Sequence, residues 1–594
     1  MGNEAIGTML GMLRAKKGYP RGKLCRGLCT SQMLIKIEKG TCEVDKFLLD
    51  MLLQRLGKSP DKLEMILSED EYKRVRLIDE IEESIWKGER EKALSLLAEY
   101  EAGFVKETNV QKMFKLRMRA YISRRIDRNM KAAETYLLQA VQLTLPGINT
   151  ENMMNYTIAG NEMENLLALG LCMFEQGEEE QAEKHLFACK QYLDANVTDE
   201  EAYAKLFGKC AWLIAKLYAK KGEYTRAYLI CEEAFVKLRR CGILYFMLPL
   251  LEQLITCGAK MGIDGEKSKW NIYHEILTEL YQDYGRPWEC KDSLFHNCNR
   301  MTCHLDSEFI RQERIAQNLT QEQLIEGVYQ SPETLSRVER GKESPVKRKF
   351  EGLMENLGVE RGKYCGTAIV EDYETLELKW QVENCIGRGD YTAAEAMLQK
   401  LKENVNLQWK MNQMMTANYQ DAILHGLKKK SAEELLAHEK ELLLLSYRAG
   451  GEGIRVPLRN ELMVQNQIGT LLRELGRVEE ADALYRQIIG TVENSRMDKH
   501  YRYQIYCLPN INLAINTEDE RLVSGGIRYE LLCGNGTLLP SYLHILAHIE
   551  RKTEAAKEPV RIMQAYYLCE LFFRESYQTL LKDYYQKHFG GNLP

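Results

Sequence analysis

The sequence predicts an all-α protein in which two units of short helices are each followed by a long array of helical hairpins. Three observations support this prediction. The 594 residues include only 12 prolines, and long amphipathic stretches are rich in Leu, Glu, Lys and Ala. Small residues recur at fixed places within these stretches. The chain is also too long for one hydrophobic core, so several domains or a repeat array are expected.

The central stretch from Leu319 to Gly341 predicts two short helices joined by a tight turn. Thr320 is a suitable N-cap for the first helix. Ser331 and Pro332 favour the start of the second helix, at its N-cap and its first helical position. Gly341 ends that helix. Such a pair of helices is the unit that lays its second helix into the major groove of DNA.

The segment from Ser307 to Tyr364 resembles the XRE (lambda-repressor-like) helix-turn-helix family. The matching residues are Arg314, Leu-Thr-Gln at 319–321, Leu324, Ser331 and Leu-Ser-Arg-Val-Glu-Arg-Gly at 335–341. The resemblance implies a five-helix DNA-binding domain. It also implies that Glu339 holds Arg314 in a structural ion pair and does not contact DNA.

The same resemblance implies which residues of the central segment contact DNA. Gln321 is expected against a phosphate. The residues expected at or near the base edges are Ser331, Pro332, Glu333, Thr334, Ser336 and Arg337. Arg337 can pair with guanine or a phosphate, and Glu333 can accept a hydrogen bond from a cytosine amine. Pro332 departs from the family pattern because it offers no donor to a base.

Residues 1–68 resemble a degenerate copy of this unit, with one residue fewer between the two key helices. Its candidate DNA-contacting residues are Arg21, Ser31, Gln32 and Lys36. Residues 1–60 hold eleven Lys and Arg against five Asp and Glu, a net charge of +6, whereas residues 305–365 hold ten against eleven, a net charge of −1. Phosphate neutralisation supplies much of the affinity for DNA, so net charge favours the N-terminal copy as the DNA-binding unit. The match to the family pattern instead favours the central copy.

Small residues mark helical hairpins after each unit. The sets Gly170, Gly177 and Ala182, then Ala215, Gly222 and Ala227, then Gly469, Gly476 and Ala481 share one spacing. This spacing resembles the tetratricopeptide repeat, whose units stack into a solenoid. Alanines recur at matching places in the two halves of the chain: Ala93, Ala133 and Ala182 in the first, and Ala394, Ala432 and Ala481 in the second. We therefore expect two helix-turn-helix domains, each followed by a tetratricopeptide-like helical solenoid.

The predicted division follows from these patterns. The ranges are 1–68 (degenerate helix-turn-helix), 69–285 (repeats), 286–304 (connector), 305–365 (helix-turn-helix) and 366–594 (repeats).

Polar residues are predicted to line the concave groove of the second array. They are Lys379, Asn466, Arg473 and Asn510. Asn side chains can hold both the N–H and the C=O of an extended peptide. An XRE domain joined to such an array resembles the RRNPP peptide-sensing regulators, which implies a short signalling peptide as ligand. Those regulators have one DNA-binding unit, not two. The alternative is that these polar residues are solvated or bridge neighbouring helices.

Other sites have weaker support. The connector gathers His296, Cys298, Cys303 and His304, but the spacing fits no standard zinc finger, and ordinary buried cysteines and surface histidines are favoured. No catalytic constellation stands out, so no enzyme activity, metal or cofactor is expected. The 17 cysteines lack paired spacing, as in reduced cytoplasmic proteins, and no apolar run reaches membrane-spanning length.

The sequence thus predicts a cytoplasmic transcriptional regulator of a bacterial type. Its expected partners are double-stranded DNA, a short signalling peptide and a second copy in a homodimer, with no membrane contact. The alternative is a repeat scaffold that does not bind DNA and captures a protein partner, with vestigial helix-turn-helix units.

Overall fold

The computed structural model is almost entirely helical. It describes residues 3–42, 44–103, 107–263, 269–285, 302–358, 364–365, 368, 370, 372–446, 459–493, 499–552, 559–591 and 593. Three short strands are the exception within these ranges. The all-α prediction is confirmed.

Four short helices form what we call the N-terminal unit. They are α1 (Asn3–Lys16), α2 (Arg21–Cys25), α3 (Ser31–Glu38) and α4 (Lys46–Arg55). Each helix contributes buried leucines to a common core, as expected for the apolar face of an amphipathic helix. They include Leu10, Leu24, Leu34 and Leu49.

The first array follows as consecutive antiparallel hairpins. Its helices are α5 (Glu69–Lys87), α6 (Arg90–Ala102), α7 (Asn109–Tyr121), α8 (Met130–Thr144), α9 (Gly160–Glu175), α10 (Glu179–Asn196), α11 (Glu200–Lys220), α12 (Tyr224–Cys241), α13 (Met247–Met261) and α14 (Lys269–Asp283), with the short turns η1 (Pro60–Lys62), η2 (Ile122–Ile126) and η3 (Met153–Asn155).

The same order of helices recurs in the second half. The central unit consists of α15 (Asp306–Ala316), α16 (Gln321–Leu324), α17 (Pro332–Glu339) and α18 (Lys347–Asn356). The second array consists of α19 (Tyr373–Arg388), α20 (Tyr391–Asn404), α21 (Lys410–Gly426), α22 (Ala432–Ser446), α23 (Arg459–Glu474), α24 (Val478–Glu493), α25 (Lys499–Thr517), α26 (Glu520–Leu532), α27 (Leu539–Lys552), α28 (Val560–Leu571) and α29 (Glu575–Phe589).

A small sheet, which the sequence did not predict, joins the halves. Strand β1 (Glu64–Leu67) lies between β2 (Thr302–Leu305) and β3 (Tyr364–Cys365). β2 runs parallel to β1, and β3 runs antiparallel to it. β2 directly precedes α15 and β3 follows α18, so both ends of the central unit are hydrogen-bonded to a strand of the first half.

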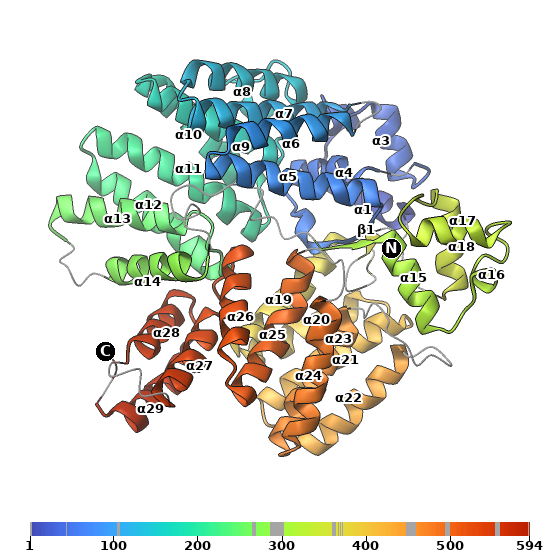
Figure 1. Ribbon diagram of the computed structural model, residues 1–594. Coiled ribbons are helices and arrows are strands. Elements are labelled where there is room, and N and C mark those ends of the chain that lie inside the picture. The colour runs from blue at the N-terminus through green and yellow to red at the C-terminus, as the bar shows by residue number, and fades with distance from the viewer. Residues whose placement is uncertain are drawn as a thin grey trace.

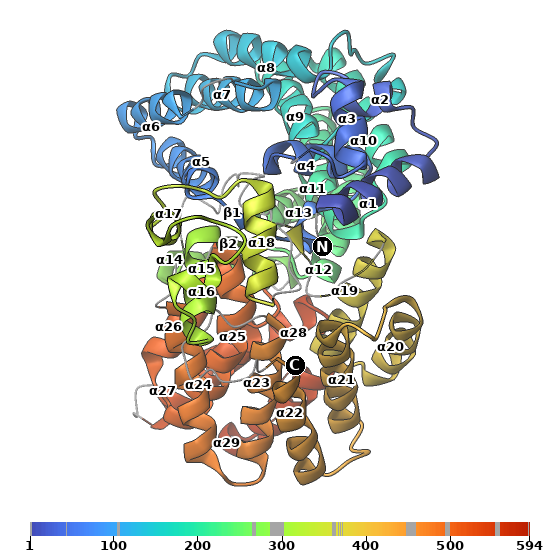
Figure 2. The ribbon, with the colours of Figure 1, turned by 90° about the vertical axis from the view of Figure 1, so that its right-hand side faces the viewer.

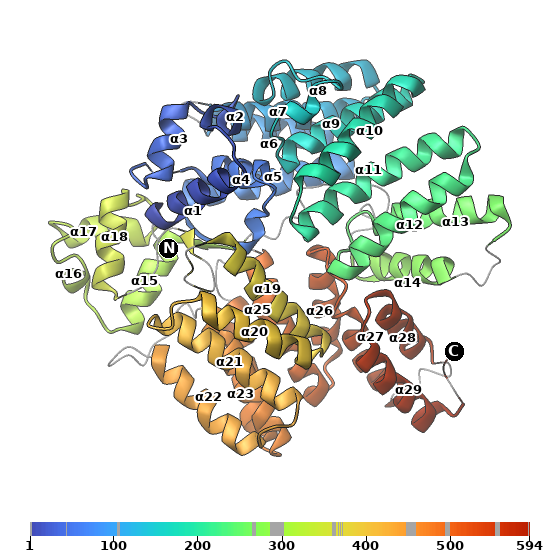
Figure 3. The same cartoon turned by 180° about the vertical axis from the view of Figure 1, so that it is seen from behind.

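The two arrays curve around a common centre. The first array forms the upper part of Figure 1 and the second array forms the lower part. Both short-helix units lie on the same side of the molecule, at the right of Figure 1, and that side faces the viewer in Figure 2. The view from behind in Figure 3 shows the same division into two facing arrays. Among the described helices, none combines the length and the apolar character needed to cross a lipid bilayer.

Small residues allow the hairpin helices to approach closely, as the repeat spacing predicted. Ala182, Ala227 and Ala481 are fully buried between paired helices. A Cβ added at Gly170 would lie 2.6 Å from the Leu186 side chain of the facing helix. The hairpin turn itself uses glycine in the left-handed region, as at Gly177 with a φ of 85°.

We expect Gly170→Ala to destabilise the first array by about 1–3 kcal/mol, because the new methyl group must displace a packed leucine. Gly490→Ala is the matched control. It lies within helix α24, where an added Cβ meets nothing within 4 Å, so a gain of up to about 1 kcal/mol is expected. Thermal unfolding followed by circular dichroism measures both. Equal midpoints for the two variants would contradict the packing argument.

Candidate nucleic-acid interface

The central unit is built around capped, very short helices. Thr320 caps α16 by accepting a hydrogen bond from the Gln323 amide at 3.2 Å, and the Gln323 side chain accepts from the Thr320 amide at 2.8 Å. Ser331 occupies the N-cap of α17 in an extended conformation, and Pro332 is the first residue of the helix. The predicted starts of both helices are therefore confirmed.

A buried carboxylate fixes the angle between these helices. The Arg314 guanidinium donates to both Glu339 oxygens, at 2.5 and 3.1 Å, and to the Leu319 carbonyl at 2.8 Å. The Gln321 side chain donates to the same Glu339 carboxylate at 2.7 Å. The predicted structural ion pair is present. Gln321, predicted to contact phosphate, is oriented by this pair at the start of α16.

The predicted base-contacting residues lie along the outer side of α17. Glu333 and Arg337 are exposed, whereas Ser331, Pro332, Thr334 and Ser336 are half-buried. Among the described residues, Arg337 forms an exposed ion pair with Glu343 at 3.3 Å, and such pairs contribute little energy, so the arginine can exchange this partner for a stronger one. The hydrogen bond from Ser331 lowers the pKa of Glu333, so this residue adds a negative charge to the surface.

The N-terminal unit repeats this side-chain arrangement. Arg14 donates to Glu38 at 2.5 Å and to the Tyr19 carbonyl at 2.9 Å, while Arg21 donates to Glu38 at 2.7 Å. Burial raises the pKa of Glu38, but the hydrogen bonds from Arg14 and Arg21 outweigh it and lower that pKa overall. Arg21 is therefore held by Glu38 as Gln321 is held by Glu339. On α3, Thr30 is the N-cap, and the candidate residues Ser31, Gln32 and Lys36 are exposed.

Residues 310–363 match the helix-turn-helix family model. This match confirms the resemblance of the central segment to that family. Two solved structures of Bacillus thuringiensis PlcR are also similar. One, in complex with the peptide PapR7 and DNA, is 17% identical and covers 46% of this chain and 98% of that chain, with a TM-score of 0.32. The other, in its apo form, is 16% identical and covers 47% and 98%, with a TM-score of 0.30. No curated protein matches the chain.

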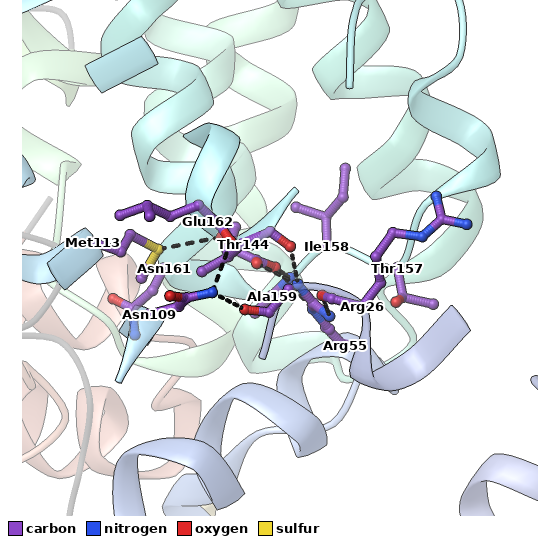
Figure 4. A network of polar contacts seen from close by, with 12 residues as sticks. Arg26, Arg55, Asn109, Met113, Thr144, Thr157, Ile158, Ala159, Asn161 and Glu162 are labelled. Atoms are coloured by element: carbon purple, nitrogen blue, oxygen red, sulfur yellow. Dashed lines mark hydrogen bonds and ion pairs between the residues drawn. The ribbon is translucent and has the colours of Figure 1, made fainter. Parts of the chain in front are cut away.

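A buried arginine locks the N-terminal unit onto its own array (Figure 4). Arg55, at the end of α4, pairs with Glu162 of α9 at 2.5 Å, and neither side chain is exposed to solvent. Its guanidinium also donates to the carbonyls of Leu24, Arg26 and Thr144 at 2.7–2.9 Å. These bonds join the turn after α2 to the ends of α8 and α9. Such long-range pairing left no signal in the sequence pattern.

Further contacts to backbone carbonyls hold the N-terminal unit against the first array. The Asn109 side chain donates to the Gly27 carbonyl at 2.8 Å and to the Leu143 carbonyl at 3.2 Å. A Cβ at Gly27, where φ is 74°, would lie 2.2 Å from the Thr144 carbonyl oxygen. Only glycine allows this approach.

The central unit has an asparagine at the corresponding place. Asn356, the last residue of α18, donates to the carbonyls of Leu324 and Glu326 at 2.7 and 2.9 Å. These are the counterparts of the bonds from Arg55 to Leu24 and Arg26. In the described part of the chain, the shorter, uncharged side chain makes hydrogen bonds only within its own unit. The two units therefore differ in how firmly side chains fix them to a repeat array.

One cavity in the described part of the chain is lined by a single one of the predicted peptide-groove residues. Lys379 lines a cavity of about 310 Å³ between the two arrays, but Asn466, Arg473 and Asn510 do not. Asn466 accepts a hydrogen bond from Asn512 at 3.3 Å, and Arg473 is half-buried. The buried Asn510 donates to Tyr506 at 2.9 Å. Asn466 thus contacts a neighbouring helix, as in the alternative interpretation, whereas Asn510 contacts a residue of its own helix. The assignment of these residues to a peptide groove stays a prediction.

Charged side chains of both signs line the cavity. Lys379 pairs with Glu383 at 3.0 Å, and burial lowers the pKa of Lys379. Burial raises the pKa of Glu383, but Arg459 and Lys379 outweigh it and bring that pKa to about 2. Arg388 and Arg574 also line the cavity. A polar ligand would meet fixed charges here.

The structure describes two of the four residues of the candidate metal cluster. His296 and Cys298 lie outside the described residues. Cys303 and His304 are buried in strand β2, and His304 faces Glu64 at 3.8 Å. Within the described residues, no group of three or more His, Cys, Asp and Glu side chains is arranged to hold a metal ion.

We expect Arg55→Ala to destabilise the N-terminal unit by about 3–5 kcal/mol, because it leaves the Glu162 carboxylate buried without a partner. Urea unfolding, with hydrogen exchange of amides in α1–α4, measures the loss. Asn356→Ala is the matched control, since it removes hydrogen bonds but no buried charge, and should cost only about 1–3 kcal/mol. The double variant Arg55→Met, Glu162→Leu removes the unpaired charge but should recover only part of the stability, because the carbonyls of Leu24, Arg26 and Thr144 still lose their donor. Equal losses for Arg55→Ala and Asn356→Ala would show that the ion pair is unimportant.

Proposed function

We propose that the chain is a DNA-binding transcriptional regulator of a bacterial type and that it acts in the cytoplasm. The observation that carries this proposal is the exposure of Glu333 and Arg337 on α17 in the matched helix-turn-helix segment, where the described partner of Arg337 is the exposed Glu343. The arginine can reach a guanine edge or a phosphate while Arg314 and Glu339 hold the helix in place. The division into two helix-turn-helix domains and two arrays, at the predicted boundaries, forms part of this proposal.

The N-terminal unit supports the same function through charge. Its exposed Lys36 and Arg21 lie on α3 and at the start of α2, where the family places contacts to bases and phosphates. Because the central unit carries little net charge, the N-terminal unit supplies most of the attraction to the phosphate backbone.

We further propose that a short peptide regulates DNA binding from the cavity between the arrays. The cavity volume of about 310 Å³ is at the lower end of the range of ligand sites. A free peptide carries an ammonium group and a carboxylate, which suit the mixed acids and bases of the lining. Since the lining comes from both halves, an occupant would favour one spacing of the arrays over another. This site replaces the groove predicted at Asn466 and Asn510.

Arg337→Ala is expected to weaken specific DNA binding by about 5- to 150-fold, the loss of one base-reading pair. Fluorescence anisotropy with a selected operator at fixed salt measures the affinity. Arg477→Ala is the matched control, since Arg477 also forms an exposed ion pair, with Glu480 at 2.7 Å, but lies in the second array. An equal effect of both variants, or none, would remove the case for α17 as the reading helix.

Gly387→Trp is expected to fill the cavity and abolish the response of DNA binding to peptide. Gly387 lines the cavity, and an added Cβ there meets nothing within 4 Å, so an indole can enter without unfolding the helix. The probe is a pooled library of short synthetic peptides, read out by operator anisotropy. Gly490→Trp, with equal open space but outside the cavity, should respond like the wild type. A response that survives Gly387→Trp but is lost in Asn466→Ala would restore the groove as the site.

A further inference from the structure

Positions in the two halves can be matched from their place in the recurring helix order. Gly57 and Gly88 match Gly358 and Gly389, an offset of 301, and all four have positive φ. Nearer the end of each half the offset is 292, because Gly242 after α12 matches Gly534 after α26, with φ of 68° and 62°. These offsets give the counterpart of any residue at the contacts between the halves.

At the sheet, a residue faces its own counterpart. Glu64 of β1 pairs with Cys365 of β3 in antiparallel register, and 365 is the counterpart of 64. The next residue, Met65, pairs with Tyr364, the residue before Cys365. In an antiparallel pair, such a register places a local two-fold axis between the two facing residues, as in an isologous dimer interface.

A second contact, far from the sheet, has the same property. Ile243 forms an antiparallel bridge with Asn535, its counterpart. The Leu244 amide donates to the Gly534 carbonyl at 2.8 Å, and the Gly536 amide donates to the Gly242 carbonyl at 3.0 Å. Because 244 matches 536 and 242 matches 534, the two bonds are reciprocal. Each of the two self-facing pairs thus marks a place through which a two-fold axis relating the halves would pass.

The ends of the arrays add reciprocal ion pairs. Lys269 of α14 and Arg561 of α28 hold matching positions. Lys269 pairs with Glu570 near the far end of α28, and Arg561 pairs with Glu279 near the far end of α14, the latter at 2.9 Å. Figure 1 shows α14 directly above α28. The helices therefore cross in the antiparallel sense that the same axis requires.

Each helix-turn-helix unit also contacts the first array helix of the other half. Lys16 of α1 pairs with Glu374 of α19 at 2.7 Å, and Ser307 of α15 donates to Glu69 of α5 at 2.9 Å. Lys347 of α18 bonds to the Gly40 carbonyl of the N-terminal unit at 2.6 Å. The helices α1 and α15 hold matching places in their halves, and each contacts the first array helix of the other half, although through different residues.

We propose that one chain is a complete two-fold pseudo-dimer that presents α3 and α17 to a single operator of two inverted, unequal half-sites. This inference rests on the proposed function. A two-fold relation turns two recognition helices in opposite directions, which matches inverted half-sites on duplex DNA. The half-sites are unequal because α3 offers Ser31, Gln32 and Lys36 where α17 offers Pro332, Glu333 and Arg337.

The full-length protein tests this directly by selection of bound duplexes from random DNA, followed by mass photometry of the complex. We expect an inverted pair of different half-sites and one chain per duplex. Lys36→Ala should weaken binding about 5- to 150-fold and relax base preference in one half-site, and Arg337→Ala should do the same in the other. Arg226→Ala, an exposed arginine of the first array, is the control.

Four outcomes would overturn the inference while DNA binding stands. These are two chains per duplex, a direct repeat, a single half-site, or both variants acting on the same half-site. Failure to select any DNA would instead overturn the proposed function. Sedimentation of the free protein then decides the pseudo-dimer by itself: a monomer supports it, because the pairing surfaces are already occupied, and a dimer of chains contradicts it.

Discussion

The placement of the central unit depends on one short strand. β1 lies between β2 and β3, the strands that come immediately before and shortly after the four helices of that unit. All four residues of β1 are buried, so its backbone groups must be paired within the protein. The unit is therefore suspended at both ends from backbone hydrogen bonds, which depend little on which side chains are present. Since β1 itself joins the N-terminal unit to α5, the same strand sets the relation between the two units.

The two units differ in the side-chain bonds made by the residue at the end of their fourth helix. Arg55 and Glu162 add a buried ion pair between the N-terminal unit and the first array. Asn356, at the corresponding place, bonds only within the central unit among the described residues. The buried pair is costly unless fully satisfied, and here the guanidinium also meets three carbonyls. A buried ion pair thus fixes the N-terminal unit to the first array, whereas the central unit is fixed by the sheet and by side-chain hydrogen bonds such as that from Ser307 to Glu69.

The features that could be predicted from the sequence are those set by a few residues at short, regular spacings. Helix starts at Thr320 and Pro332, the small residues of the hairpins and the pair of Arg314 with Glu339 all follow from short spacings with a clear physical cause. The strands were missed because four residues of β1 show no alternation, and Cys303 and His304 of β2 resembled a weak metal cluster. Arg55 and Glu162 lie 107 residues apart, beyond any local pattern. The assignment of Asn510 to a peptide groove stays a prediction, since its one described side-chain hydrogen bond, to Tyr506, lies within its own helix.

The proposed pairing of two halves within one chain has a consequence for how DNA binding depends on the amount of protein. Partners on separate chains must meet by diffusion, so the fraction assembled falls as the protein is diluted. Halves on one chain meet at a high effective concentration set by the intervening segment, whatever the number of molecules in the cell. Occupancy of a target would then rise in simple proportion to the amount synthesised, even from a few copies. Mixed assemblies with related proteins, a common source of cross-talk between regulators, would also be avoided.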